Sequence, residues 1–279
     1  MKLILMGTND FVVPVFDDLA NKHDIIAVFT RAPKPTGRKH VLTPSPVHFW
    51  AEQKKLPIYT SIKEFETITT KPDMIVVISY GVILRDNVLN SAKCINIHPS
   101  SLPKYRGPSP IRTAILNGDK NMDVCLMDMV SEMDAGDVYM RKNIVIDEND
   151  TNETMEQKVS RTAIKMLDEY LKNPGLYPPI PQSGEPTFTC KFEGTDEIID
   201  WKKSAQQIHN QIRALGCGRT KINGIDVKIL ETKIENNELK IVKIQPSGKN
   251  PMDWKSFVNG LRGADIKYGD LNANTTQML

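Results

Sequence analysis

The chain has 279 residues, a formal net charge of only +2 and 25% charged residues, values typical of one or two ordinary globular domains and not of a polycation. No apolar run approaches the roughly 18 residues of a membrane span, and the run before Gly7 is too short for a secretory signal. The cysteines form no Cys-x-x-Cys pair, which favours reduced thiols, with Cys94 and Cys125 in the core. We therefore expect a cytoplasmic protein.

The N-terminal half alternates short apolar runs with segments of helical spacing. This alternation predicts an α/β fold with a doubly wound, mostly parallel, Rossmann-like sheet. A lone Gly7 after the first run is not the Gly-x-Gly-x-x-Gly fingerprint, so a dinucleotide site has little support. Strands are predicted at 2–6, 25–30, 71–79, 94–98 and 123–129, and helices at 12–19, 47–55 and 109–116.

The run at 94–98 carries the most chemistry. Its alternation places Asn96 and His98 on one face of a strand, and Pro99 ends that strand. The carboxyl ends of parallel strands form the edge at which open α/β sheets bind ligands. An imidazole can accept a proton, and an amide N–H can stabilise a developing oxyanion. The Asn-x-His-Pro spacing therefore favours a catalytic pair over two side chains that merely cap the strand.

Residues 31–46 form a long segment rich in Pro and basic side chains. It contains Arg31, Lys34, Arg38 and Lys39, and no acidic residue occurs between Asp24 and Glu52. A long irregular segment inside a compact domain is usually functional or disordered. Positive charge without compensation indicates a phosphate-rich partner. A solvated loop explains the same pattern equally well.

The segment 131–137 supplies the carboxylates of Asp134 and Asp137, which come 36 and 39 residues after His98. A carboxylate beside an imidazole orients the ring and raises its basicity. Spacing alone does not choose between Asp134 and Asp137, and a simple Asp/Gly turn is the structural alternative.

The C-terminal part predicts a second, smaller domain. Helices are expected at 153–172 and at 200–215, the latter with Asp200 as the N-cap. Proline is concentrated between these helices, which indicates a stiff linker. Short strands at 222–229 and 238–244, with turns at Asn223-Gly224 and Asn236-Asn237, indicate a small OB-like β-barrel. The predicted domains are 1–173 (catalytic), 174–187 (linker) and 188–279 (OB-like).

Several segments together form one recognisable pattern. They are Met6-Gly7-Thr8 with Asp10-Phe11, Gly37-Arg38 with Pro44-Ser45-Pro46-Val47, Tyr80-Gly81-Val82-Ile83-Leu84, Cys94-Ile95-Asn96-Ile97-His98, Ser100-Ser101-Leu102-Pro103 with Arg106-Gly107, Pro110-Ile111, Met133-Asp134-Ala135-Gly136-Asp137, and Gln245-Pro246-Ser247-Gly248-Lys249 with Met252. The pattern resembles the formyltransferase family that uses 10-formyltetrahydrofolate, over nearly the whole chain. Pro99, Ser101 and Lys104 depart from the residues common in the family.

The resemblance implies a role for each matching residue. Asn96, His98 and Asp134 are similar to the catalytic trio. The folate-contacting residues would be Ser100, Ser101, Leu102 and Pro103, with Tyr80, Gly81, Val82 and Leu84 at the pterin pocket. The tRNA-contacting residues would be Arg38, Lys39, Lys34 and Lys249. The C-terminal domain looks shortened by a hairpin between the segments near 230 and 238.

The resemblance also implies the reaction. The formyl group of 10-formyltetrahydrofolate, a co-substrate, would pass to the amino group of methionyl-initiator-tRNA, without a metal and in a monomer. The first alternative is a formyltransferase for a sugar-nucleotide or glycinamide-nucleotide amine. A second is a formyltetrahydrofolate hydrolase with water as the nucleophile, and a third is a non-catalytic RNA-binding protein.

Overall fold

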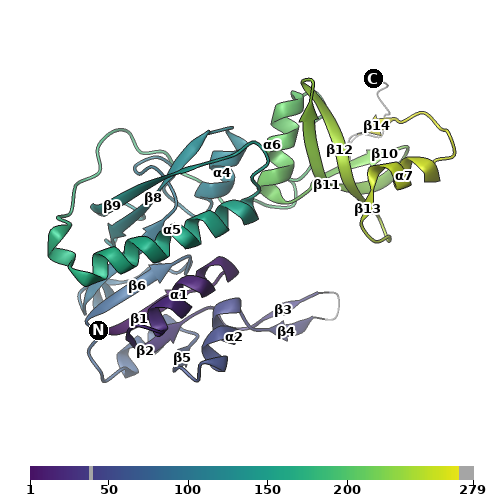
Figure 1. Ribbon diagram of the computed structural model, residues 1–279. Coiled ribbons are helices and arrows are strands. Elements are labelled where there is room, and N and C mark those ends of the chain that lie inside the picture. Colours follow the sequence, from purple (N-terminus) through teal and green to yellow (C-terminus); the bar gives the residue numbers. More distant parts are fainter. Residues whose placement is uncertain (38–39, 270–279) are drawn as a thin grey trace. The chain divides into compact units, whose positions relative to one another are not determined.

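The computed structural model of the chain describes residues 1–37 and 40–269 (Figure 1). Its Cα atoms group into two compact units. Unit 1 contains residues 1–110, 122–144 and 156–189, and unit 2 contains residues 111–121, 145–155 and the chain from 190 onward. Within the described ranges, no helix is both long and apolar enough to cross a lipid bilayer.

Unit 1 is built on a seven-stranded sheet with the order β5-β2-β1-β6-β7-β8-β9. The pairs from β5 through β7 are parallel, and β8 runs antiparallel to β7. The prediction of a mostly parallel, Rossmann-like sheet is confirmed. The strands are β1 (Lys2–Gly7), β2 (Asp24–Phe29), β5 (Ile58–Tyr59), β6 (Met74–Ile78), β7 (Lys93–His98), β8 (Asn121–Asp128) and β9 (Val138–Val145).

Helical segments cover both faces of this sheet. Helices α1 (Val13–Ala20) and α5 (Asn152–Lys172) lie on one face (Figure 1), where Lys22 forms an ion pair with Asp168 of α5 at 2.7 Å. On the other face lie the 3₁₀ segment η2 (Ile62–Thr67) and helix α3 (Asp86–Leu89).

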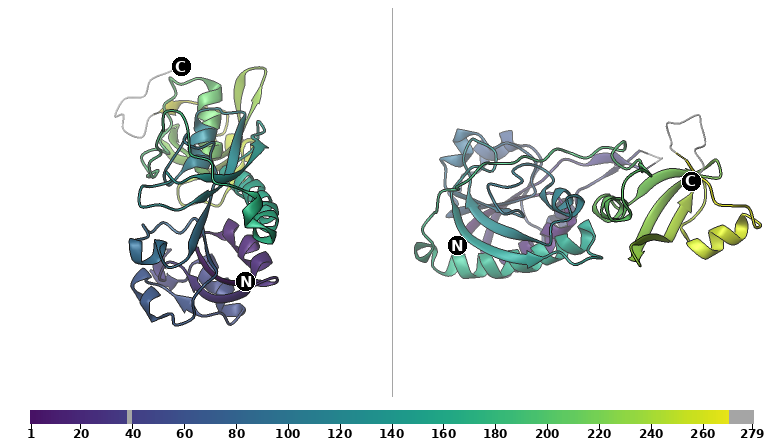
Figure 2. Two further views of the ribbon diagram at one scale, coloured as in Figure 1. Left: turned by 90° about the vertical axis from the view of Figure 1, so that its left-hand side faces the viewer. Right: turned by 90° about the horizontal axis from the view of Figure 1, so that it is seen from above.

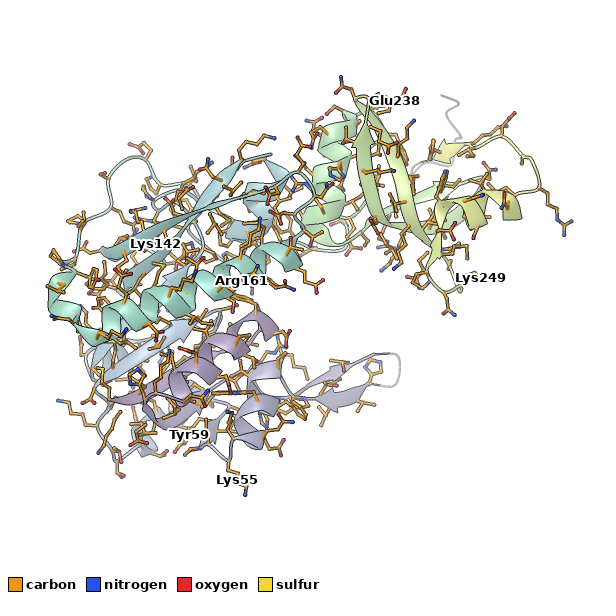
Figure 3. The ribbon with its side chains drawn as sticks, viewed as in Figure 1. Lys55, Tyr59, Lys142, Arg161, Glu238 and Lys249 are labelled. Carbon is orange, nitrogen blue, oxygen red and sulfur yellow. The ribbon has the colours of Figure 1, made fainter. Side chains whose placement is uncertain are left out.

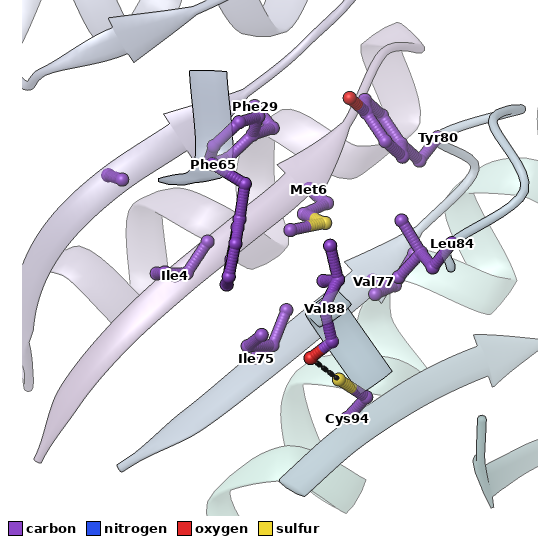
Figure 4. Packing of buried hydrophobic residues seen from close by; sticks show 11 residues of the cluster. Ile4, Met6, Phe29, Phe65, Ile75, Val77, Tyr80, Leu84, Val88 and Cys94 are labelled. Atoms are coloured by element: carbon purple, nitrogen blue, oxygen red, sulfur yellow. Dashed lines mark hydrogen bonds between the residues drawn. The ribbon is translucent and has the colours of Figure 1, made fainter. Parts of the chain in front are cut away.

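The core on the η2 side is made of alternate strand residues (Figure 4). Ile4 and Met6 of β1 pack there beside Ile75 of β6 and Phe65 of η2. Burying such side chains stabilises the fold by about 1.5–3 kcal/mol each. Because successive side chains of a strand point to opposite faces, every second residue of these continuous apolar runs enters this layer. Cys94 lies in the same cluster, and burial raises the pKa of its thiol to about 12, as expected for a core residue.

The basic segment after β2 is more regular than its sequence suggests. We expected an irregular loop, but β3 (Lys34–Thr36) and β4 (Val41–Thr43) form an antiparallel hairpin that projects from unit 1 (Figures 1 and 2). The Thr36 hydroxyl hydrogen-bonds the Thr43 hydroxyl across the pair, a contact that no local pattern reports. Helix α2 (Pro46–Gln53) follows, and its cap, Ser45 Oγ, accepts from His48 N at 3.0 Å.

Unit 2 contains a five-stranded sheet with the order β13-β12-β11-β10-β14, antiparallel throughout. The predicted small β domain is confirmed in this form, and its core includes Ile212, Ile229 and Ile244. Positive φ angles at Asn236 and Asn237 make the tight turn between its two longest strands. The elements are β10 (Gly218–Ile222), β11 (Ile225–Glu235), β12 (Glu238–Pro246), β13 (Met252–Asp253), β14 (Tyr268–Gly269), α4 (Pro110–Leu116), α6 (Ala205–Leu215) and α7 (Trp254–Gly260).

Helix α6 begins later than predicted. Ser204, not Asp200, is its N-cap, because Ser204 and Gln207 form a reciprocal capping box that Asp200 cannot make. The helix also buries His209, whose Nε2 donates to Glu148 O at 3.2 Å and whose Nδ1 hydrogen-bonds Thr232 Oγ1 at 2.8 Å. Burial lowers the pKa of His209 below its ordinary value.

Candidate active site

The candidate site lies at the carboxyl end of β7 in unit 1. Asn96 and His98 are two residues apart on this strand, so their side chains share one face, and both are at least nine-tenths buried. The strand occupies the predicted residues and pairs with β6 on one side and β8 on the other. Neighbouring strands therefore surround the pair and limit its movement.

Both ring nitrogens of His98 face oxygen atoms. Nε2 lies 3.0 Å from Tyr105 O, and because a carbonyl oxygen only accepts, Nε2 carries a proton. Nδ1 lies 3.6 Å from Asp134 Oδ1, a distance suited to an ion pair but too long for a hydrogen bond. Asp134 Oδ1 and Tyr105 O therefore face opposite sides of the ring and fix its orientation.

Asp134 is the carboxylate beside His98. Its Oδ2 accepts from Gly107 N at 2.7 Å, and its own backbone takes a positive φ of 53°. Asp137 instead uses its backbone oxygen to accept from Asp128 N at 2.8 Å, next to the start of β9. Spacing left open which of the two aspartates lies beside His98, and the 3.6 Å contact identifies it as Asp134.

Asn96 keeps its amide available. Among the described residues, no side chain or backbone group hydrogen-bonds to this amide, although only 9% of Asn96 is exposed. Asn96 is not among the residues whose unpartnered polar atoms are completely buried, so its amide is reachable from outside the protein. The Asn96 amide N–H is therefore positioned to donate to an oxygen atom bound beside His98.

The residues predicted to contact folate divide into buried and exposed groups. Ser100 and Leu102 are buried, whereas Ser101 and Pro103 are partly exposed, and Ser101 Oγ accepts from Asp123 N. Tyr80 and Leu84 lie in the core cluster, and burial raises the pKa of Tyr80 to about 12. Gly81 has a positive φ, and Val82 is exposed.

Two loops expose apolar side chains that could cover a flat ring. Val82 and Ile83 project from the loop after β6, and Val130 and Met133 from the loop before Asp134; all four are 43–78% exposed. Exposed apolar side chains on loops are common in ligand-binding sites, and these loops follow β6 and precede Asp134.

The residues predicted to contact tRNA are spread over the chain. Lys34 is exposed on β3 of unit 1, and Lys249 is exposed on the turn that follows β12 of unit 2 (Figure 3). Arg38 and Lys39 lie outside the described residues.

The sequence analysis missed the residues that join the two loops around His98. Arg106 donates to Glu132 Oε1 at 2.9 Å and to Gln182 Oε1 at 2.9–3.2 Å, and Gln182 lies in the stretch expected to be a linker. No local signal marks Gln182, because its partners are 76 and 48 positions away. In the described part of the chain, no group of three or more His, Cys, Asp or Glu could hold a metal ion.

This fold and site are those of a formyl transferase. The sequence model of the formyl transferase family matches residues 1–171, and that of the formyl transferase C-terminal domain matches residues 191–240. The chain belongs to the formyl transferase family.

Similar proteins carry a more particular name. The methionyl-tRNA formyltransferase of Listeria monocytogenes is 36% identical over 93% of this chain and 95% of its own length. That of Ehrlichia chaffeensis is 37% identical over 93% of this chain and 97% of its own length. Among solved structures, the methionyl-tRNA formyltransferase from Clostridium thermocellum superposes with a TM-score of 0.64 at 16% identity, covering 88% of this chain and 98% of its own.

The fold is also shared with enzymes named for other acceptors. The N-formyltransferase from Helicobacter canadensis, solved in complex with folinic acid and dTDP-3-aminofucose, has a TM-score of 0.66 and 21% identity over 85% of this chain and 88% of its own. At this identity the likeness concerns the fold alone.

Proposed function

We propose that this chain transfers the formyl group of 10-formyltetrahydrofolate to the amino group of methionyl-initiator-tRNA, forming formylmethionyl-tRNA for translation initiation. The observation that carries the proposal is the contact of buried His98 with the partly buried Asp134, with the unpaired amide of Asn96 on the same strand face. The similarity to methionyl-tRNA formyltransferases over 93% of the chain supports this acceptor. The protein is proposed to act as a monomer.

The folate co-substrate supplies an activated formyl group on its N10 atom. The methionyl amine forms a bond to the formyl carbon, the bond from that carbon to N10 breaks, and the amine's proton ends on N10. Negative charge develops on the formyl oxygen in between, and the Asn96 N–H donates to it. Removing one such donor in a preorganised site costs roughly 10²–10³ in rate.

His98 is proposed to carry the proton between the two nitrogen atoms. Its Nε2 donates to Tyr105 O and its Nδ1 faces Asp134, so the reacting groups must replace one of these contacts. The Asp134 carboxylate orients the ring through its contact with Nδ1. Hydrogen bonds in ligand-free sites commonly rearrange when substrate binds, so this geometry is compatible with catalysis.

Contact with folate is proposed through Pro103 and the backbone of 100–103, with Val82 and the segment 80–84 forming one wall of the pterin pocket. The other predicted folate residues would hold these contacting groups in place by packing behind them; they are Ser100, Ser101, Leu102, Tyr80, Gly81 and Leu84. Contact with the tRNA is proposed through Lys34, Arg38, Lys39 and Lys249, and residues 188–279 are proposed as the tRNA-contacting domain. Phosphate contacts of this kind weaken as salt concentration rises.

The testing experiment is formyl transfer from labelled 10-formyltetrahydrofolate to methionyl-tRNA, with Asn96→Ala and uncharged tRNA as controls. The expected result is label on the charged tRNA only, and its loss in the variant. Release of formate without an acceptor would indicate a hydrolase. Transfer to a sugar-nucleotide or glycinamide-nucleotide amine, with none to the tRNA, would move the acceptor and refute the proposal.

A further inference from the structure

The inference concerns how the His98–Asp134 pair is held, and it rests on the proposed function. Two loops surround the pair: residues 103–107, which follow β7, and residues 132–136, which precede β9. The Gln182 side chain joins them. Its Oε1 accepts from Arg106 Nε and Nη2 at 3.2 and 2.9 Å, and its Nε2 donates to Asp134 O and Gly136 O, both at 2.8 Å.

This amide uses all of its hydrogen-bonding capacity. A glutamine side chain offers two N–H donors and an oxygen with two acceptor positions, and all four are occupied here. A carboxylate of the same size has no donor, so Glu would keep the contacts with Arg106 and lose both with the loop of Asp134. The site is therefore selective for an amide.

Asp134 needs to be held in place. Its φ of 53° lies in the left-handed region, which Asp tolerates but does not prefer. Gln182 binds the carbonyl oxygen of Asp134 itself and that of Gly136, while Gly107 N binds the Asp134 carboxylate. Without the amide, the backbone turn that aims the carboxylate at His98 loses two of its bonds.

The same stretch of chain also holds the other acceptor of His98. Thr187 Oγ1 accepts from Tyr105 N at 2.9 Å and Thr187 O accepts from Arg106 N at 2.8 Å, which fixes the peptide whose oxygen, Tyr105 O, meets His98 Nε2. Core packing does not explain the attachment, since Ile180 and Phe188 at its ends are 63% and 62% exposed. Polar contacts near the site hold this stretch.

We propose that Gln182 is a positioning residue of the formyl-transfer reaction. It acts through Asp134, holding that carboxylate against His98, and touches neither substrate. Loss of its two donated hydrogen bonds lets the carboxylate drift from the ring. Because catalysis depends on sub-ångström placement, the chemical step suffers while substrate binding does not.

The test compares Gln182→Glu with Ser183→Glu, which adds the same charge at the neighbouring, exposed position. Steady-state transfer to methionyl-tRNA should show kcat lowered about 10- to 100-fold in the first variant, because misplacement of about 1 Å has that effect. KM for both substrates should stay close to that of the unaltered protein, as should kcat of Ser183→Glu. Unfolding midpoints of all proteins are measured alongside.

A double-mutant cycle separates positioning from a general structural role. In an Asp134→Ala background, Gln182→Glu should change single-turnover rates by less than about twofold, because residues acting through one another are not additive. An equal loss in both backgrounds, or a wild-type kcat in Gln182→Glu, would overturn the inference. If Gln182→Glu lowers the unfolding midpoint, the double-mutant cycle is repeated with Gln182→Met in its place, and the same two outcomes would overturn the inference.

The failure of the proposed function would look different. In that case the unaltered protein would not formylate methionyl-tRNA at all, whereas failure of the present inference leaves the unaltered protein active and sensitive to Asn96→Ala.

Discussion

Replacing Asn96 with Ala should separate catalysis from stability. The Asn96 amide is nine-tenths buried, yet it forms no hydrogen bond with any described residue. Removing it therefore breaks no bond within the folded protein and leaves no partner unsatisfied. The substitution therefore avoids the cost of about 1–3 kcal/mol for an unsatisfied buried group, and the free energy of unfolding should change by about 1 kcal/mol or less.

The rate should respond very differently. In the proposed reaction the amide donates to an oxygen that gains charge only in the transition state, and such a donor is worth about 2.7–4 kcal/mol. Since about 1.4 kcal/mol corresponds to a factor of ten, kcat should fall roughly 10²- to 10³-fold. KM for folate should change little, because the formyl oxygen carries little extra charge in the ground state.

Steady-state formylation and urea unfolding of the same preparations test this reasoning. His98→Ala is the informative comparison, because it removes a buried ring that contacts the partly buried Asp134 carboxylate, and it should lower both rate and stability. Two results would refute the role given to Asn96: a loss of folate binding as large as the loss of rate, or a kcat that is unchanged.

Three further predictions concern other parts of the molecule. Gly136→Ala should lower both stability and kcat, because a Cβ at this position would lie 2.1 Å from Asp128 O. Urea unfolding and an activity assay check this prediction, and full activity would contradict it. The free energy of unfolding should fall as pH drops below about 6.5, because the buried His209 has a lowered pKa and the unfolded chain takes up the proton first. His209→Gln should reduce this dependence, and unfolding of both proteins at pH 7.5 and 5.5 measures it; equal slopes would exclude His209 as the cause. Lys249→Ala should weaken tRNA binding and reduce the slope of log affinity against log salt by about 1. Filter-binding titrations measure this slope, and an unchanged slope would show that Lys249 does not contact the tRNA.

Much of the fold could be predicted because its signals are local. Continuous apolar runs marked β1, β2, β6 and β7, and the alternation at 94–98 placed Asn96 and His98 on one face. The turns at Asn223-Gly224 and Asn236-Asn237 were also recognisable, since Gly and Asn are the residues that accept positive φ angles. Each of these signals needs only the few neighbouring residues that form the element.

Other features depended on competition between local signals. Asp200 and Ser204 are both plausible N-caps, and Ser204 prevails because Gln207 completes a capping box with it. The basic stretch after β2 had no strand pattern of its own, and its hairpin forms through pairing of β3 with β4.

The sequence by itself determined the type of sheet, the order of its parallel strands along the chain, and the presence of an amide and an imidazole at one strand end. Only the tertiary structure decided which carboxylate joins them and what holds it there. Asp134 reaches His98 through a charged contact, and Gln182 reaches Asp134 and Arg106 through hydrogen bonds; the paired residues are 36 to 76 positions apart in the sequence. Periodicity reports which face a residue occupies within its own element, whereas contacts over such separations arise only when the loops between the elements are folded.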